Sequence, residues 1–238
     1  MTWLWRIFFS GCWLAPLWCA SVTGSVVLTD SRDPGVRHNQ NFSGVVIWLG
    51  PASGRAPLDG APHRYRMEQK DKHFIPHVLA IPVGAAVDFP NLDPIFHNVF
   101  SNYNGQIFDL SLYRPGTSRR QVFDRPGIVR VFCNIHPTMS AVIAVLDTPW
   151  FAVSGARGEF EIRDVPPGSY TLHIFHERAS EETLNALVET VAIAGAAPRA
   201  LQGIRISETG YIPAPHKNKW NKDYPPASDD PAGYGPHP

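Results

Sequence analysis

Short runs of β-branched and aromatic residues, separated by proline and glycine, recur along the whole chain. The 23 prolines and 19 glycines lie between these runs instead of clustering in one segment. Short strands at such spacing are typical of sandwiches and barrels, so the pattern predicts an all-β protein. In the first two thirds of the chain it predicts strands at 24–29, 44–49, 65–69, 77–81, 86–89, 97–100, 121–123, 127–132 and 141–146.

The clearest alternation lies in residues 127–147. Val129, Val131 and Cys133 fall on one face of a strand because side chains alternate with a period of two. The chain breaks at 134–139 and resumes as an apolar run at 141–146, which is typical of a central strand. Residues 133–139 are therefore predicted to form a loop between two core strands, at one end of a sandwich.

A boundary near Asp147 divides the chain into a first domain at 22–147 and a second at 148–210. The second unit is predicted to contain a tight turn at 165–168, a short helix at 179–186 and strands at 151–153, 159–162, 170–176, 187–193 and 201–206. From residue 211 to 238 the chain is rich in proline and glycine and poor in aliphatic residues. We predict an extended tail that lies on the domains through Tyr211, Trp220 and Tyr224.

The first 21 residues have the pattern of a secretory signal. Arg6 is followed by an apolar stretch at 7–18 and small residues at 19–24, which predicts cleavage near Ala20 or Ser21. A retained membrane anchor is the alternative. No later segment is apolar and long enough to cross a bilayer, so we expect a periplasmic or otherwise exported protein with no membrane span after cleavage.

Removal of the signal leaves Cys133 as the only cysteine. An unpaired thiol in an oxidising compartment requires burial or a bound metal. The 21 basic and 21 acidic residues balance, and no basic block is present, so nucleic acid is not expected as a partner.

Three possible metal ligands, Cys133, His136 and Met139, lie within seven residues, and His97 lies upstream. One thiolate, two imidazoles and a weak axial thioether are the ligands of a blue-copper electron-transfer site. Zinc is the main alternative metal, since it accepts cysteine and histidine but has little use for the thioether. A Cys–His nucleophile pair is a further alternative, although such pairs usually come from distant parts of a fold.

Residues 60–147 resemble the type 1 copper proteins, the cupredoxins of the plastocyanin and amicyanin type. The similarity lies in the Cys133-x2-His136-x2-Met139 loop, the upstream pair His97-Asn98, and the lead-in at 82–89 with Asn91. The resemblance implies a Greek-key β-sandwich holding one type 1 copper ion. It implies that the equatorial ligands are His97, Cys133 and His136 and that the axial ligand is Met139. It also implies that the ligands are surrounded by Asn98, Asn134 and Pro137.

Residues 158–172 resemble the carboxypeptidase regulatory-like, or transthyretin-like, β-sandwiches. The whole chain resembles cupredoxin proteins that carry the label methylamine utilization protein. These resemblances imply a non-enzymatic carrier that passes single electrons to a cytochrome or dehydrogenase. The alternatives are copper storage or delivery without redox chemistry, and an adhesion or binding module centred on the second sandwich.

Overall fold

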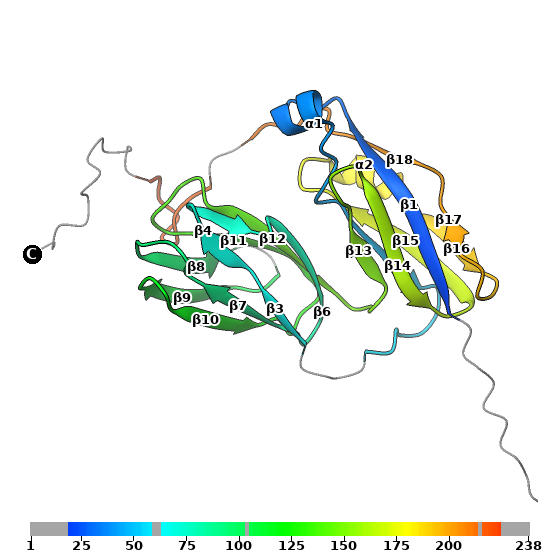
Figure 1. Cartoon of the computed structure of the whole chain (residues 1–238), viewed down its shortest axis with the longest axis horizontal. Coiled ribbons are helices and arrows are strands. Elements are labelled where there is room, and N and C mark those ends of the chain that lie inside the picture. The colour runs from blue at the N-terminus through cyan, green and yellow to red at the C-terminus, as the bar shows by residue number, and fades with distance from the viewer. Residues whose placement is uncertain (1–18, 59–62, 103–104, 214–215, 225–238) are drawn as a thin grey trace, which may run out of the picture.

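The computed structural model describes residues 19–58, 63–102, 105–213 and 216–224, and these residues form two β-sandwiches (Figure 1). The all-β prediction is confirmed. Short helices occur at α1 (Pro34–Asn39), capped by the Asp33 side chain, and α2 (Glu181–Asn185), capped by Ser180. Within the described residues, no helix combines the length and the apolar character that crossing a bilayer requires.

The first sandwich contains a five-stranded sheet in the order β6-β12-β11-β8-β9 and a three-stranded sheet in the order β10-β7-β3. Its apolar core lies between them and includes Phe89, Val131 and Ile143, none of which is exposed. The hairpin β4–β5 adjoins this core through Phe74. The strands are β3 (Arg64–Arg66), β4 (Glu68–Lys70), β5 (His73–Ile75), β6 (Val78–Pro82), β7 (Ala86–Pro90), β8 (His97–Ser101), β9 (Phe108–Tyr113), β10 (Ser118–Val122), β11 (Gly127–Phe132) and β12 (Ser140–Leu146).

The second sandwich packs β14, β1, β17 and β18 against a sheet in the order β13-β2-β15-β16. Its core includes Ile47, Ile162 and Leu172. The strands are β1 (Ala20–Thr29), β2 (Val46–Pro51), β13 (Phe151–Val153), β14 (Glu159–Val165), β15 (Gly168–Phe175), β16 (Glu189–Ile193), β17 (Arg199–Ala200) and β18 (Ile204–Ser207).

The predicted domain boundaries, 22–147 and 148–210, are wrong at the N-terminal side. β1 pairs antiparallel with β14 and parallel with β18, while β2 lies between β13 and β15. The first sandwich is therefore inserted between β2 and β13 of the second, as Figure 1 shows. The predicted signal at 1–21 lies outside the described residues except for its last three, of which Ala20 and Ser21 begin β1.

Most predicted strands are confirmed to within a few residues, but β5, β9, β17 and α1 were not predicted. β9 was missed although Phe108, Leu110 and Leu112 alternate with polar residues; its pairing with β8 is irregular between Asn98 and Phe100, and Ser111 has a positive φ of 58°. Such an irregularity shifts the buried face within a strand, so that Leu112 is 52% exposed whereas Tyr113 is buried. The segment predicted as one strand at 65–69 is divided at Met67 into β3 and β4.

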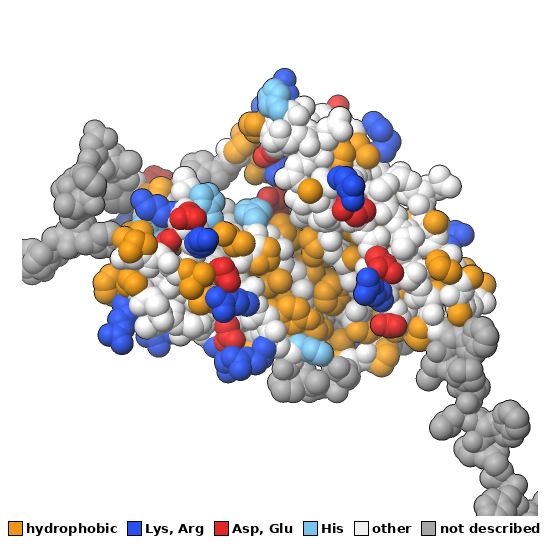
Figure 2. Space-filling view, viewed as in Figure 1, with side chains coloured by type: hydrophobic (Ala, Val, Ile, Leu, Met, Phe, Trp, Pro, Cys, Tyr) orange, Lys and Arg blue, Asp and Glu red, His pale blue; other side chains and the backbone are white. Residues whose placement is uncertain are grey.

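The two sandwiches share an apolar interface. Val78 and Ala80 of β6 and Ala144 of β12 form one buried cluster with Val46 of β2, and Phe175 packs against it. Figure 2 shows apolar side chains gathered where the two sandwiches meet. Because both sheets contribute fully buried side chains, the interface resembles a domain core.

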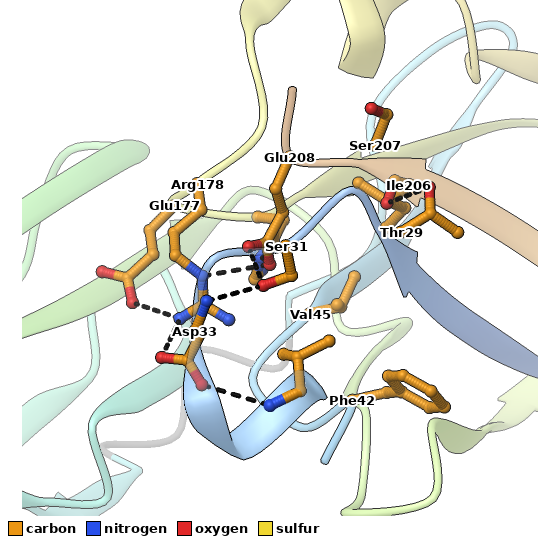
Figure 3. Close-up of polar contacts among 12 residues, drawn as sticks. Thr29, Ser31, Asp33, Phe42, Val45, Glu177, Arg178, Ile206, Ser207 and Glu208 are labelled. Atoms are coloured by element: carbon orange, nitrogen blue, oxygen red, sulfur yellow. Dashed lines mark hydrogen bonds and ion pairs between the residues drawn. The ribbon is translucent and has the colours of Figure 1, made fainter. Parts of the chain in front are cut away.

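A buried polar network closes one end of the second sandwich (Figure 3). Glu208, only 4% exposed, accepts hydrogen bonds from Ser31 Oγ at 2.6 Å, from His176 Nε2 at 2.8 Å and from Arg178 Nε at 3.0 Å. Glu177 in turn binds His77 of the first sandwich at 2.8 Å. The network therefore joins the end of β1, the end of β15 and the end of β18, and it reaches the neighbouring sandwich.

Glu208→Gln should lower the free energy of unfolding by about 1–2 kcal/mol, because the amide retains one acceptor oxygen but loses the charge that serves three donors. Chemical denaturation of the metal-free protein measures this loss. Glu189→Gln, at an exposed position of β16, is the matched control and should change stability by less than about 0.5 kcal/mol. Equal stability of the two variants would contradict the role given to this network.

Candidate metal centre

The loop between β11 and β12 is held in a compact shape by its own backbone. Cys133 N–H donates to the carbonyl of Met139 at 3.1 Å, and Met139 N–H donates to the carbonyl of His136 at 3.1 Å. Since the paired strands β11 and β12 fix both ends of the loop, the relative positions of Cys133 and His136 are set locally. The prediction of a loop at 133–139 between two core strands is confirmed.

His97 reaches the loop from the neighbouring strand. It is the first residue of β8, which pairs with β11 through Phe100 and Phe132. Asn98 joins the two segments, because its Oδ1 accepts a hydrogen bond from Asn134 N–H at 2.7 Å. Its Nδ2 donates to Asp109 at 2.8 Å, so the side chain is fixed from both ends.

Three donor atoms converge at this point. Cys133 Sγ lies 3.8 Å from His97 Nδ1 and 3.6 Å from His136 Nδ1, and one donor atom from each residue lies within 4.8 Å of the others. An ion bound at about 2.0–2.3 Å in a trigonal plane separates sulfur from nitrogen by about 3.8 Å. The three predicted residues are therefore spaced as ligands of a single ion.

The remaining predicted residues lie around this group. Met139 has no exposed surface and belongs to the same apolar cluster as Cys133. Its backbone forms hydrogen bonds with the backbone of Cys133 and of His136. Asn134 accepts a hydrogen bond from Lys219 N–H at 2.9 Å. Pro137 is in the exposed part of the loop.

Asp93 supports this group of side chains and was not identified from the sequence. Its Oδ2 accepts a hydrogen bond from His97 Nε2 at 2.7 Å, and its carboxylate also accepts from the backbone N–H groups of Asp71 and Lys72. A carboxylate on Nε2 leaves Nδ1 unprotonated and aimed at the metal. The only local signal in the sequence is that Asp93 lies four residues before His97. The β4–β5 turn, whose backbone N–H groups bind Asp93, lies about twenty residues earlier in the chain.

Burial sets the protonation of the three donors. It lowers the pKa of His97, against the opposing effect of Asp93, and together with the charge of His97 it lowers the pKa of His136 to about 4. Burial raises the pKa of the Cys133 thiol, against hydrogen bonds from the backbone of Asn98, Ile135 and His136. At neutral pH the site therefore presents two neutral imidazoles and one protonated thiol.

Metal binding at pH 7 should release about one proton per ion, because only Cys133 has a proton to lose. Calorimetric titration with Zn²⁺ as a redox-inert probe, in buffers of different ionisation enthalpy, counts this proton. The affinity should rise about tenfold per pH unit between pH 6 and 8. Release of two or more protons would show that an imidazole is protonated in the metal-free protein.

The geometry accommodates both metals considered from the sequence. A tetrahedral ion would bring sulfur and nitrogen to about 3.6 Å, close to the trigonal value. The chemistry of the donor set discriminates better. Met139 is buried in the same apolar cluster as Cys133, and a thioether added to a cysteine and two histidines suits copper, whereas structural zinc sites are completed by cysteine, histidine or carboxylate.

A scan against protein-family models finds no match to the chain. Among curated proteins, it is 42% identical over 60 residues to the methylamine utilization protein MauL of Methylorubrum extorquens. The match covers 25% of this chain and 53% of MauL, so this chain spans about half the length of the relative that it matches.

Solved cupredoxin structures are also similar to the chain. A purple cupredoxin from Nitrosopumilus maritimus is 24% identical with a TM-score of 0.32, over 34% of this chain and 99% of its own. A reduced variant of amicyanin is 19% identical with a TM-score of 0.33, over 42% and 98% respectively. A copper-containing nitrite reductase from Thermus scotoductus is 26% identical with a TM-score of 0.35, over 51% and 28%. The chain is thus similar to MauL over a 60-residue stretch and to these solved structures at TM-scores below 0.5.

Proposed function

We propose that this chain is an exported protein that binds one copper ion at a type 1 site and passes single electrons. In this proposal His97, Cys133 and His136 are equatorial ligands and Met139 is the axial ligand. The observation that carries it is the convergence of one buried sulfur and two Nδ1 atoms within 4.8 Å. When bound, copper supplies a one-electron couple that a thiolate and imidazoles serve in both oxidation states.

The protein keeps this site dry and fixed. His97, Cys133 and Met139 have no exposed surface, and Asp93 and Asn98 hold the ligands from outside. A ligand set fixed by the fold limits the rearrangement that accompanies a change of charge on the metal. These features support electron transfer over substrate chemistry, because the four ligands leave no open position for a substrate.

His136 is the ligand through which we expect electrons to leave. It is the one member of the converging group that is partly exposed, and it lies next to Pro137 on the loop surface. The name of the MauL relative refers to methylamine utilization, and a cytochrome or dehydrogenase is the partner class we propose. A periplasmic location agrees with the predicted signal at 1–21.

An absorption spectrum of the copper-loaded protein tests the proposal. Thiolate-to-Cu(II) charge transfer should give an intense absorption band at about 600 nm that disappears on reduction. One-electron exchange with a small cytochrome should be fast, while loss of copper to a chelator should be slow. Rapid copper loss without electron exchange would instead support a copper carrier, and a colourless oxidised protein would end the type 1 assignment.

A further inference from the structure

The C-terminal segment 216–224, here called the clamp, returns from the second sandwich and lies on the proposed ligand loop of the first (Figure 1). Tyr224 Oη donates a hydrogen bond to the carbonyl of Cys133 at 2.7 Å. Lys219 N–H donates to Asn134 Oδ1 at 2.9 Å. These contacts fall on Cys133 and on the residue that follows it.

The clamp is an ordered turn with its own internal bonds. Asn218 is 8% exposed, and its Oδ1 accepts from Trp220 N–H at 3.0 Å and from Lys222 N–H at 3.0 Å. Asn218 N–H donates to the carbonyl of Lys222 at 2.9 Å. The turn thus holds Lys219, which lies within it, and Tyr224, which follows it, in position.

Two further contacts seat the clamp beside the loop. The His216 ring stacks on Phe132 with ring centroids 4.2 Å apart, and Tyr224 meets His216 edge-on at 5.1 Å. Lys219 Nζ binds Asp109 Oδ2 at 2.8 Å, and Asp109 also binds Asn98. The clamp therefore contacts Phe132, directly before the ligand loop, and Asp109, which accepts a hydrogen bond from Asn98.

The contacts of the clamp affect the electrostatic field at the ligand loop as well as the position of the loop. The O–H dipole of Tyr224 points its positive end at the backbone of the sulfur-bearing residue, and the ammonium group of Lys219 offsets the negative charge of Asp109 beside Asn98. A reduced copper–thiolate site carries one positive charge less than the oxidised site. Positive charge and exclusion of water both favour that reduced state.

We propose that the clamp fixes the ligand loop and raises the reduction potential of the site, with Tyr224 as its positioning residue. The effect on potential rests on the function proposed above. The effect on the loop depends only on contacts between residues of this chain. No residue of the clamp needs to touch the metal.

Tyr224→Phe in the full-length protein tests the clamp, because it removes the hydroxyl and keeps the ring. In the metal-free protein, amide hydrogen exchange at 133–139 should accelerate about three- to tenfold, while exchange in β14 stays unchanged. Asn218→Ala, which loosens the turn without touching the loop, should act in the same direction. Tyr211→Phe, in the chain before the clamp, should leave exchange at the loop unaltered.

In the copper-loaded protein, Tyr224→Phe should lower the reduction potential and speed copper loss to a chelator about three- to tenfold. Unchanged loop exchange in both Tyr224→Phe and Asn218→Ala would overturn the clamp. Accelerated exchange with an unchanged potential would overturn the tuning role. Absence of a reversible one-electron couple in the unaltered protein would instead count against the proposed function, and the metal-free exchange would still decide whether the clamp fixes the loop.

Discussion

Cys133→Ser should remove the visible band of the copper-loaded protein completely. In the proposed site the band arises from charge transfer out of a thiolate, and a serine hydroxyl remains protonated at neutral pH at a position with no exposed surface. Copper affinity should fall on the order of a hundredfold or more, since the loss of a ligand exceeds the loss of a supporting residue. Absorption spectra and chelator competition measure the two effects.

The fold of this variant is expected to persist, because serine is close to cysteine in size and the hydroxyl lies near backbone N–H groups. Chemical denaturation of the metal-free protein checks this point. His38→Gln on helix α1 is the matched control, as it removes a histidine from the second sandwich and should leave the band unaltered. Persistence of the band in Cys133→Ser would mean that the absorption has another source.

The ligand loop could be predicted because its information is local. Cys133, His136 and Met139 lie between two strongly apolar strands, so spacing and periodicity together reveal both the loop and its donors. His97 was a candidate from residue type and from the resemblance, and the structure places its Nδ1 3.8 Å from the Cys133 sulfur. The identity of the metal and the thioether ligand remain proposals.

The domain boundary could not be predicted in the same way. The alternation in β1 reveals a strand, but periodicity does not state its partner. β1 pairs with β14, more than 130 residues along the chain, and the first sandwich is inserted between them. Strand order is decided by which apolar faces can be buried together, and this depends on the whole chain.

The tail shows how far residue type alone can guide a prediction. Aromatic residues in a chain segment poor in aliphatics suggested that it lies on the domains, and Tyr224 does contact the ligand loop. Trp220, predicted to do the same, is 62% exposed and lies beneath Lys219 Nζ at 5.0 Å. The hydroxyl of tyrosine gives it a donor for a buried carbonyl, and this distinguishes the two positions.

Asp93→Ala should weaken metal binding about 10- to 100-fold, the usual effect of removing a residue that orients a ligand. Without the carboxylate, His97 Nε2–H loses its acceptor at 2.7 Å, and the tautomer with Nδ1 free is no longer favoured. The turn at Asp71 and Lys72 also loses the acceptor for two backbone N–H groups. Chelator competition gives the affinity, and nitrogen-15 shifts of the imidazole give the tautomer.

Asp93→Asn separates the loss of the acceptor for His97 from the loss of the acceptors for the turn. Asp93 Oδ2 accepts from both His97 Nε2 and Lys72 N–H, so an amide oxygen at this position keeps both bonds while Asp71 N–H loses its acceptor, and the affinity should fall between those of the unaltered protein and Asp93→Ala. Asp124→Ala removes an exposed carboxylate from the same sandwich and controls for charge. If Asp93→Ala and Asp124→Ala bind metal equally well, the carboxylate does not orient His97. Equal affinities of Asp93→Asn and Asp93→Ala, with His97 in the wrong tautomer in both, would assign the whole effect to the charge of the carboxylate.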